Sequence, residues 1–82
     1  MGTRTAKRGH GMDIGRAIRD KAREAGVTQA ELCRATGLSD GYMSMLMNSK
    51  IDDPQVKKVH AIAHAMGCTV DELIALAERY GG

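Results

Sequence analysis

Apolar positions along this chain recur at helical spacing, and their pattern predicts five helices and no strand. Asp13 is expected to cap the first helix, which ends at Gly26. One face of this helix carries the apolar residues Ile14, Ala17, Ile18, Ala22 and Ala25. Two short helices follow, over about residues 29–35 and 40–47. The first half of the chain is therefore predicted to contain three helices separated by short turns.

Two more helices are predicted after a loop over residues 48–52. Asp53 is expected to cap the fourth, with Pro54 in its first turn, where proline removes no helical hydrogen bond. The inward positions of this helix are Val56, Val59, Ile62, Ala63 and Met66. Thr69 and Glu72 have the spacing of a capping box for the fifth helix. The fifth helix has more apolar residues than a small core needs, which makes it the candidate contact with a second copy of the chain: Leu73, Ile74, Leu76 and Ala77.

The second and third helices are joined by a tight turn with its own sequence signals. Thr28 and Glu31 have the spacing of a capping box, and Ser39 can cap the third helix. Gly37 supplies a turn conformation that residues with a Cβ avoid. The side chains expected to pack the pair together are Leu32, Cys33, Leu38, Met43 and Leu46. Two short helices joined in this way form a helix-turn-helix pattern, which leaves one face of the third helix free for a DNA groove.

The helix-turn-helix segment resembles the phage repressor and Cro (Xre-like) family of DNA-binding domains. The shared pattern, Thr-Gln-x-Glu-Leu-small-x-x-x-Gly-aliphatic-Ser-x-x-x-aliphatic-Ser, runs from Thr28 to Ser44. The resemblance continues through Pro54, Val59, Ile62, Ala63, Ala65, Met66, Gly67 and residues 70–73, and it covers roughly residues 13–78. It implies an all-α fold, a compact five-helix lambda-repressor-like domain over residues 12–80. It also implies a dimeric transcriptional regulator that places its third helix in the major groove of double-stranded DNA.

The resemblance implies two sets of DNA-contacting residues. The base-facing set is Asp40, Gly41, Ser44 and Met45, and the backbone-contacting set is Thr28, Gln29, Ser39, Tyr42, Asn48 and Lys50. The base-facing set lacks the Arg, Lys, Asn and Gln side chains that usually read the major groove. We therefore expect sparse direct readout, with more of the specificity left to DNA shape or to a partner. Lys57 and Lys58 are weaker candidates for contacts with the DNA backbone, and an ordinary solvated helix face is the preferred interpretation of both.

The chain departs from the family pattern in two ways. Many members pair an Arg of the first helix with a Glu at the end of the third, whereas this chain has Ala22 and Met47 there. An apolar contact is expected instead, which is often as stable as a buried ion pair. The family glycine after the third helix is Ser49, where a positive φ is less favourable. Neither departure changes the predicted fold.

Length and charge define a single small domain with a basic arm. The 82 residues suffice for one core, and with no Phe or Trp and only two Tyr it must be built from aliphatic side chains and Met. The net charge of +2 is uneven, because residues 1–11 carry Arg4, Lys7 and Arg8 and no acid. This arm fits binding to DNA, and a solvated terminus is the alternative. No apolar run has the length of a membrane span and no signal peptide is visible, so a cytoplasmic, nucleoid-associated prokaryotic or phage protein is predicted.

Other kinds of chemistry are not favoured by the pattern. Cys33 and Cys68 are expected to be reduced thiols rather than a disulfide. His60, His64 and Cys68 follow one another at intervals of four, but zinc needs further ligands, so no metal and no cofactor is predicted. No cluster of nucleophile, acid and base occurs, and we expect neither enzyme activity nor a small-molecule substrate. The alternative function is an antitoxin-like or accessory protein-interaction module with the same fold.

Overall fold

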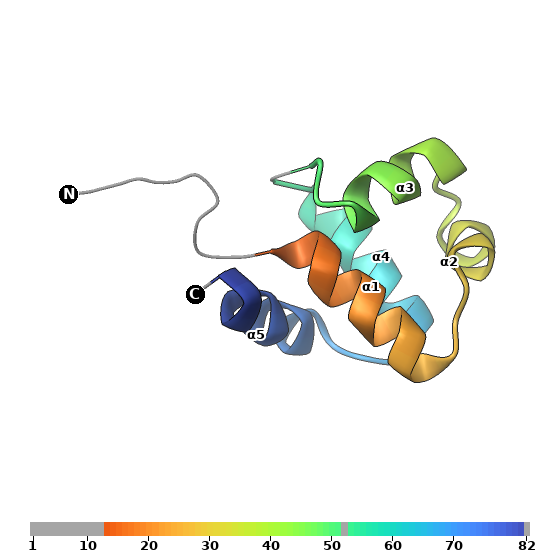
Figure 1. The fold of residues 1–82 in the computed structure, drawn as a ribbon. Helices are drawn as coiled ribbons and strands as arrows, with labels where there is room; N and C mark the ends of the chain where they lie inside the picture. Colours follow the sequence, from red (N-terminus) through yellow and green to blue (C-terminus); the bar gives the residue numbers. More distant parts are fainter. Residues whose placement is uncertain (1–12, 52, 82) are drawn as a thin grey trace.

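The computed structural model describes residues 13–51 and 53–81, and these form five helices (Figure 1). The helices are α1 (Ile14–Ala25), α2 (Gln29–Thr36), α3 (Asp40–Met47), α4 (Val56–Met66) and α5 (Val70–Gly81). No strand occurs within the two described ranges. The all-α, five-helix prediction is confirmed. The basic arm with Arg4, Lys7 and Arg8 lies outside the described residues.

Helix α1 lies at the centre of the fold, with α3 on one side and α5 on the other (Figure 1). It also packs on α4, and α2 packs on α3 and α4. The buried core is Ile14, Ala17, Ile18, Ala22, Leu32, Met43, Leu46, Met47, Val59, Ile62, Ala63, Met66, Leu73 and Ala77. All of these are aliphatic residues or Met, as the scarcity of aromatic residues predicts. No polar or charged side chain is buried in the part of the chain that the structure describes.

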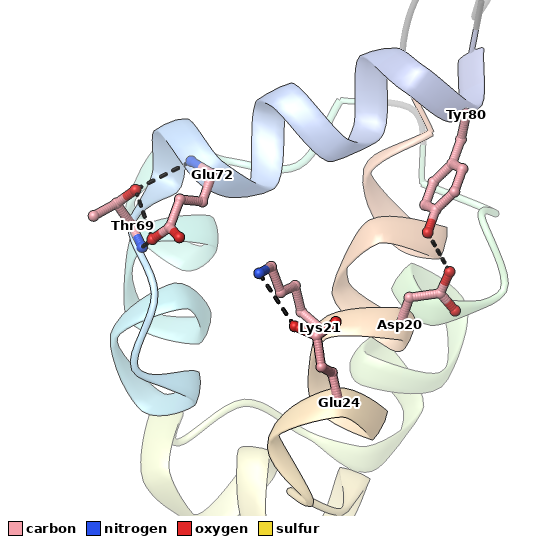
Figure 2. Close-up of polar contacts among 6 residues, drawn as sticks. All are labelled: Asp20, Lys21, Glu24, Thr69, Glu72 and Tyr80. Carbon is pink, nitrogen blue, oxygen red and sulfur yellow. Dashed lines mark hydrogen bonds and ion pairs between the residues drawn. The ribbon is translucent and has the colours of Figure 1, made fainter.

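Local capping decides where α1, α2 and α5 begin. The Asp13 side chain accepts a hydrogen bond from the Arg16 backbone N–H at 3.1 Å, as a helix cap does. At α5 the backbone N–H of Thr69 donates to Glu72 Oε1 at 2.8 Å, while the Glu72 N–H donates to Thr69 Oγ1 at 3.1 Å (Figure 2). The hydrogen bond from the Thr69 backbone N–H lowers the pKa of the Glu72 carboxyl, and the Thr69 hydroxyl, which donates to the same oxygen at 3.2 Å, lowers this pKa further. This predicted capping box and its counterpart at α2 are both confirmed.

The start of α4 differs from the sequence-based prediction. The cap residue is Gln55 rather than Asp53, and no side chain caps the helix there. Pro54 lies before the helix instead of in its first turn. Gln55 has the extended conformation φ −64, ψ 139, so the chain turns into the helix only after it. Val56, predicted to face inward, is 77% exposed because it stands at the uncovered first turn, whereas the other four predicted inward residues of α4 are buried.

The apolar surplus predicted on α5 is smaller than the sequence indicates. Leu73 and Ala77 are fully buried, because α5 lies against α1 and these side chains close the core there. They are therefore unavailable to a second copy of the chain. Only Ile74 and Leu76 of the four predicted residues remain partly exposed.

No single described helix is long and apolar enough to cross a membrane. Helices α4 and α5 pass that test only when they are joined end to end, and they are bent by 102° relative to each other.

Candidate nucleic-acid interface

The turn between α2 and α3 is fixed by hydrogen bonds at both helix ends. Gly37 has φ 77, in the left-handed region, and its N–H donates to the Cys33 carbonyl at 2.8 Å. The Ser39 hydroxyl then accepts from the Tyr42 N–H at 3.1 Å and caps α3. Because neither bond leaves much freedom to the intervening residues, α3 starts at a defined angle to α2.

Helix α3 has one buried and one open face. Met43, Leu46 and Met47 are buried, and they attach the helix to the rest of the domain. The residues predicted to face DNA bases lie on the open part: Asp40, Gly41 and Met45 are exposed and Ser44 is half-buried. Met45 is 49% exposed, although burial of a long apolar side chain is energetically favourable. The base contacts themselves stay a prediction.

The residues predicted to touch the DNA backbone gather around the ends of α2 and α3. Thr28 and Ser39 are the exposed caps of the two helices. The Gln29 side-chain amide donates to the Asp40 carbonyl at 3.4 Å and so links the two helix starts. At the other end of α3, the Asn48 amide donates to the Ser44 carbonyl at 2.9 Å.

The other two predicted backbone-contacting residues, Tyr42 and Lys50, lie in the first turn of α3 and in the loop after it. Lys50 is exposed in the loop after α3, and its N–H donates to the Met45 carbonyl at 2.9 Å. Tyr42 is half-buried in the first turn of α3. The structure therefore brings all six predicted backbone-contacting residues next to the open face of α3, and their contacts with DNA stay a prediction.

Arg19 is a residue of this region that the sequence pattern does not reveal. Its guanidinium Nη1 donates to the Met47 carbonyl at 3.1 Å, at the last residue of α3. A positive charge there also opposes the negative end of the helix dipole. The two positions where the family has an ion pair, Ala22 and Met47, are both in the buried core, as expected. Arg19 precedes Ala22 by three residues on the same helix, and that spacing is the one signal that could have identified it.

Gly15 is the second such residue, and it acts through its missing side chain. A Cβ on Gly15 would lie 2.0 Å from the Leu46 carbonyl oxygen and 3.1 Å from the Ser49 nitrogen. Because these are backbone atoms, α1 and the end of α3 can approach this closely only with glycine here. A glycine inside a helical pattern weakens the helix, which is a sequence signal for such a packing role.

Ser49 completes the connection between α1 and the end of α3. Its φ is 60, so the positive angle of the family glycine is kept despite the Cβ. The Ser49 hydroxyl donates to Asp13 Oδ1, and Asp13 is also the cap of α1. We call the links through Asp13, Gly15 and Arg19 the α1–α3 contact. It fixes α3 to the central helix α1.

The residues considered for metal binding do not form a metal site. His60, His64 and Cys68 line an open hollow beside the start of α5. Across residues 13–51 and 53–81, no three His, Cys, Asp or Glu side chains converge closely enough to hold an ion. Cys33 and Cys68 are free thiols, and their partial burial raises the pKa of both.

The fold and the turn geometry define a helix-turn-helix domain with its second helix exposed for recognition. The model of the Cro/C1-type HTH DNA-binding domain matches residues 17–78, and the chain belongs to this family. No curated protein matches the chain significantly. DNA binding follows from this membership, and the resemblance inferred from the sequence is confirmed.

Solved structures of regulators show the same fold. The clp gene regulator ClgR from C. glutamicum superposes with a TM-score of 0.80 at 27% identity, over 87% of this chain and 91% of that one. The restriction-modification controller protein C.AhdI from Aeromonas hydrophila gives 0.69 at 19% identity, over 76% and 92%. The biofilm master regulator SinR, solved in complex with DNA, gives 0.70 at 21% identity, over 74% and 97%. At these lower identities, C.AhdI and SinR show the fold alone.

Proposed function

We propose that this DNA-binding domain is a sequence-specific transcription regulator that places α3 in the major groove. One observation carries the proposal: α3 is buried along one face and open along the other, with helix caps and polar side chains around the open face. A major groove admits an α-helix presented in this way. The likeness to ClgR, a gene regulator, supports the regulatory role. No catalytic role is proposed, and the protein would act in the cytoplasm on chromosomal or phage DNA.

Four residues of α3 would meet the base edges. Met45 can contact a thymine methyl group, and Asp40 can accept a hydrogen bond from a cytosine amino group. Gly41 permits close approach of the helix to the DNA, and the Ser44 hydroxyl can form a hydrogen bond with any of several bases. Because none of the four makes the two-point hydrogen bonds of Arg, Asn or Gln, DNA shape would supply part of the specificity.

The backbone of DNA would be held by helix ends and polar side chains around α3. Gln29 stands at the N-terminus of α2, where free backbone N–H groups and the helix dipole favour a phosphate. The other residues of this set are Thr28, Ser39, Tyr42, Asn48 and Lys50. The basic arm over residues 1–11 would add contacts through Arg4, Lys7 and Arg8.

A homodimer is proposed through the exposed apolar residues of α4 and α5. Val56 and Ile74 line one shallow apolar hollow together with Pro54 and Val70. Leu76 lines a different and more charged hollow with Lys21 and Arg79, so it is less suited to an apolar contact. The dimer surface is therefore centred on Val56 and Ile74 rather than on the four α5 residues that the sequence indicates.

The test compares Met45→Ala, Asp40→Asn and Gln29→Ala on a selected operator and on a scrambled duplex at matched salt. Met45→Ala should weaken binding to the operator more than binding to the scrambled duplex, because it removes a base contact. Asp40→Asn should strengthen binding to both duplexes and relax the sequence preference. Gln29→Ala should weaken binding to both duplexes by similar factors, because a phosphate contact reads no sequence.

Three folded variants that all bind like the wild type would contradict the proposed role of α3. The protein-interaction module would then be the better description of the chain.

A further inference from the structure

Lys58 of α4 lies against the ring of Tyr42 of α3. Its Nζ atom is 4.5 Å from the ring centroid, within the range of a cation–π contact. Both side chains are half-buried, so neither rotates freely in solvent. Helix α3 packs mainly on α1 and α2, and this contact gives it a side-chain link to α4. Lys58 is therefore more restricted than its exposed neighbour Lys57.

The charge of Lys58 remains available to an anion. The two ion pairs among the described residues, Lys21–Glu24 and Arg23–Asp20, are both on α1, so no described carboxylate neutralises Lys58. An aromatic face attracts the ammonium group but offers its three N–H donors no conventional acceptor. A lysine held in this way keeps its hydrogen-bonding capacity while its position is restricted.

The pair approaches the open face of α3 from α4, and Gln29 approaches it from α2. Gln29 contacts the Asp40 carbonyl from α2, whereas Lys58 contacts Tyr42 from α4. A helix in the major groove has one phosphate backbone on each side. If Gln29 meets the backbone on the α2 side, the backbone on the opposite side passes near Tyr42 and Lys58. The Tyr42 hydroxyl has no hydrogen-bond partner among the described residues and can donate to a phosphate oxygen.

We propose that Tyr42 and Lys58 form a phosphate clamp on the α4 side of the recognition helix. The Tyr42 hydroxyl and the Lys58 ammonium bind the same DNA phosphate, and the ring positions the ammonium for that contact. The clamp rests on the proposed insertion of α3 into the major groove. It adds Lys58 to the DNA-contacting residues and couples its contribution to that of Tyr42.

The test measures DNA affinity across a series of salt concentrations for Lys58→Met, Lys58→Arg and Tyr42→Phe. Lys58→Met should weaken binding to the operator and to the scrambled duplex alike, by about threefold to fivefold. Its dependence of log affinity on log salt should be shallower by about 0.9, the change for one lost phosphate contact. Lys58→Arg should keep the wild-type slope. Tyr42→Phe should weaken binding with an unchanged slope, because it removes a hydroxyl and no charge.

Lys21→Met is the matched control, because Lys21 pairs with Glu24 and lies beside α5. It removes the same charge away from the proposed DNA face, so its slope should equal that of the wild type. Tyr42→Leu, alone and combined with Lys58→Met, tests the coupling. The double variant should lose less affinity than the product of the two single losses, because Lys58 is no longer positioned once the ring is gone.

Several results would overturn the clamp. A wild-type salt slope for Lys58→Met would do so, and so would a loss confined to the operator or fully independent effects in the double variant. If Gln29→Ala and Met45→Ala still behave as proposed in that case, the regulator function stands and the clamp alone is wrong. If the wild-type protein fails to distinguish operator from scrambled duplex, the function and the clamp fail together.

Discussion

Helix α1 holds its two neighbours α3 and α5 by different means. Toward α3 the closest contact is between backbones, where Gly15 lies against the Leu46 carbonyl. The Arg19 and Asp13 side chains add hydrogen bonds with the Met47 carbonyl and the Ser49 hydroxyl. Toward α5 one backbone hydrogen bond, from the Asp13 N–H to the Ala77 carbonyl at 3.0 Å, lies at the start of α1, and the polar contacts along the helix are made between side chains. The Tyr80 hydroxyl donates to Asp20 Oδ2, as Figure 2 shows, and the Arg16 guanidinium lies 4.1 Å from the centroid of the Tyr80 ring.

The difference indicates which neighbour must be placed accurately. Backbone atoms cannot adopt other rotamers, so the α1–α3 contact permits one spacing between the helices. Apart from the hydrogen bond between Asp13 and Ala77, the contact with α5 is made by side chains, which can adjust to small shifts and substitutions. Helix α3, which we propose to face DNA, is therefore held at Gly15 by the less adjustable of the two contacts. Substitutions that change one of the two contacts and leave the other intact test this comparison.

Gly15→Ala should have the largest effect. The new Cβ would overlap the Leu46 carbonyl oxygen at 2.0 Å, and α3 would have to move away from α1. We expect the free energy of unfolding to fall by about 2 to 3 kcal/mol, as for overpacked cores. DNA affinity should fall as well, because the recognition helix is displaced. Chemical denaturation and a binding titration measure the two effects.

Gly41→Ala provides the matched control for this prediction. Gly41 lies on α3, and a Cβ added to it would meet no atom of another element within 4 Å, so alanine finds no obstacle there. The substitution should raise the free energy of unfolding by about 0.5 to 1 kcal/mol, through better helix propensity. If Gly15→Ala stabilised the protein to the same extent, the close approach of α1 and α3 would not be a constraint.

Arg19→Met should have the next largest effect. It removes the hydrogen bond to the Met47 carbonyl and the positive charge at the end of α3, while it keeps an apolar stem. The expected loss of stability is about 1 kcal/mol, with a weaker affinity for DNA. Arg23→Met removes the same charge from an exposed ion pair on the same helix, and it should change little. Equal effects of the two variants on stability would show that the α3 contact of Arg19 has no special role.

Features encoded by neighbouring residues could be predicted from the sequence. The range of α3 follows from the Ser39 cap, and the start of α2 from the Thr28–Glu31 box. Each of these signals acts within four residues, so a sequence pattern contains all of its parts. The exposed face of α3 was predictable for the same reason, because it is the complement of the buried positions Met43 and Leu46.

Features made by distant residues could not be predicted in this way. Gly15 meets Leu46, and Lys58 meets Tyr42, only after the chain has folded. The burial of Leu73 likewise depends on how α5 lies on α1, which helical spacing does not specify. The predicted start of α4 was wrong for a local reason, since aspartate and proline suit both a helix start and an extended approach to it.

Tyr80→Phe should reduce stability less than Arg19→Met. It removes the hydroxyl that binds Asp20 but keeps the ring under the Arg16 guanidinium. Because the contact lies between α1 and α5, the position of α3 and the affinity for DNA should stay unchanged. A thermal melt and a binding titration of the same preparation measure both. A marked loss of DNA affinity would show that the α5 contact also positions the recognition helix.

The smallest expected effect is the change that Tyr80→Phe makes in acid sensitivity. The hydrogen bond from Tyr80 lowers the pKa of the Asp20 carboxyl, with smaller contributions from Arg23, Arg16 and Arg19. A carboxyl with a lowered folded-state pKa stabilises the fold above its unfolded pKa, and this stabilisation is lost as the pH falls through the folded value.

The stability difference between wild type and Tyr80→Phe should therefore be present near pH 7 and shrink as the pH falls below 3.8, the ordinary pKa of an aspartate. Both proteins should still lose stability in acid, because the pKa values of Glu31 and Glu72 in the two capping boxes are also lowered. Denaturant titrations of both proteins near pH 7 and at about pH 3 measure the difference. A difference that stays constant over this range would show that the Asp20 charge does not contribute to the contact between α1 and α5.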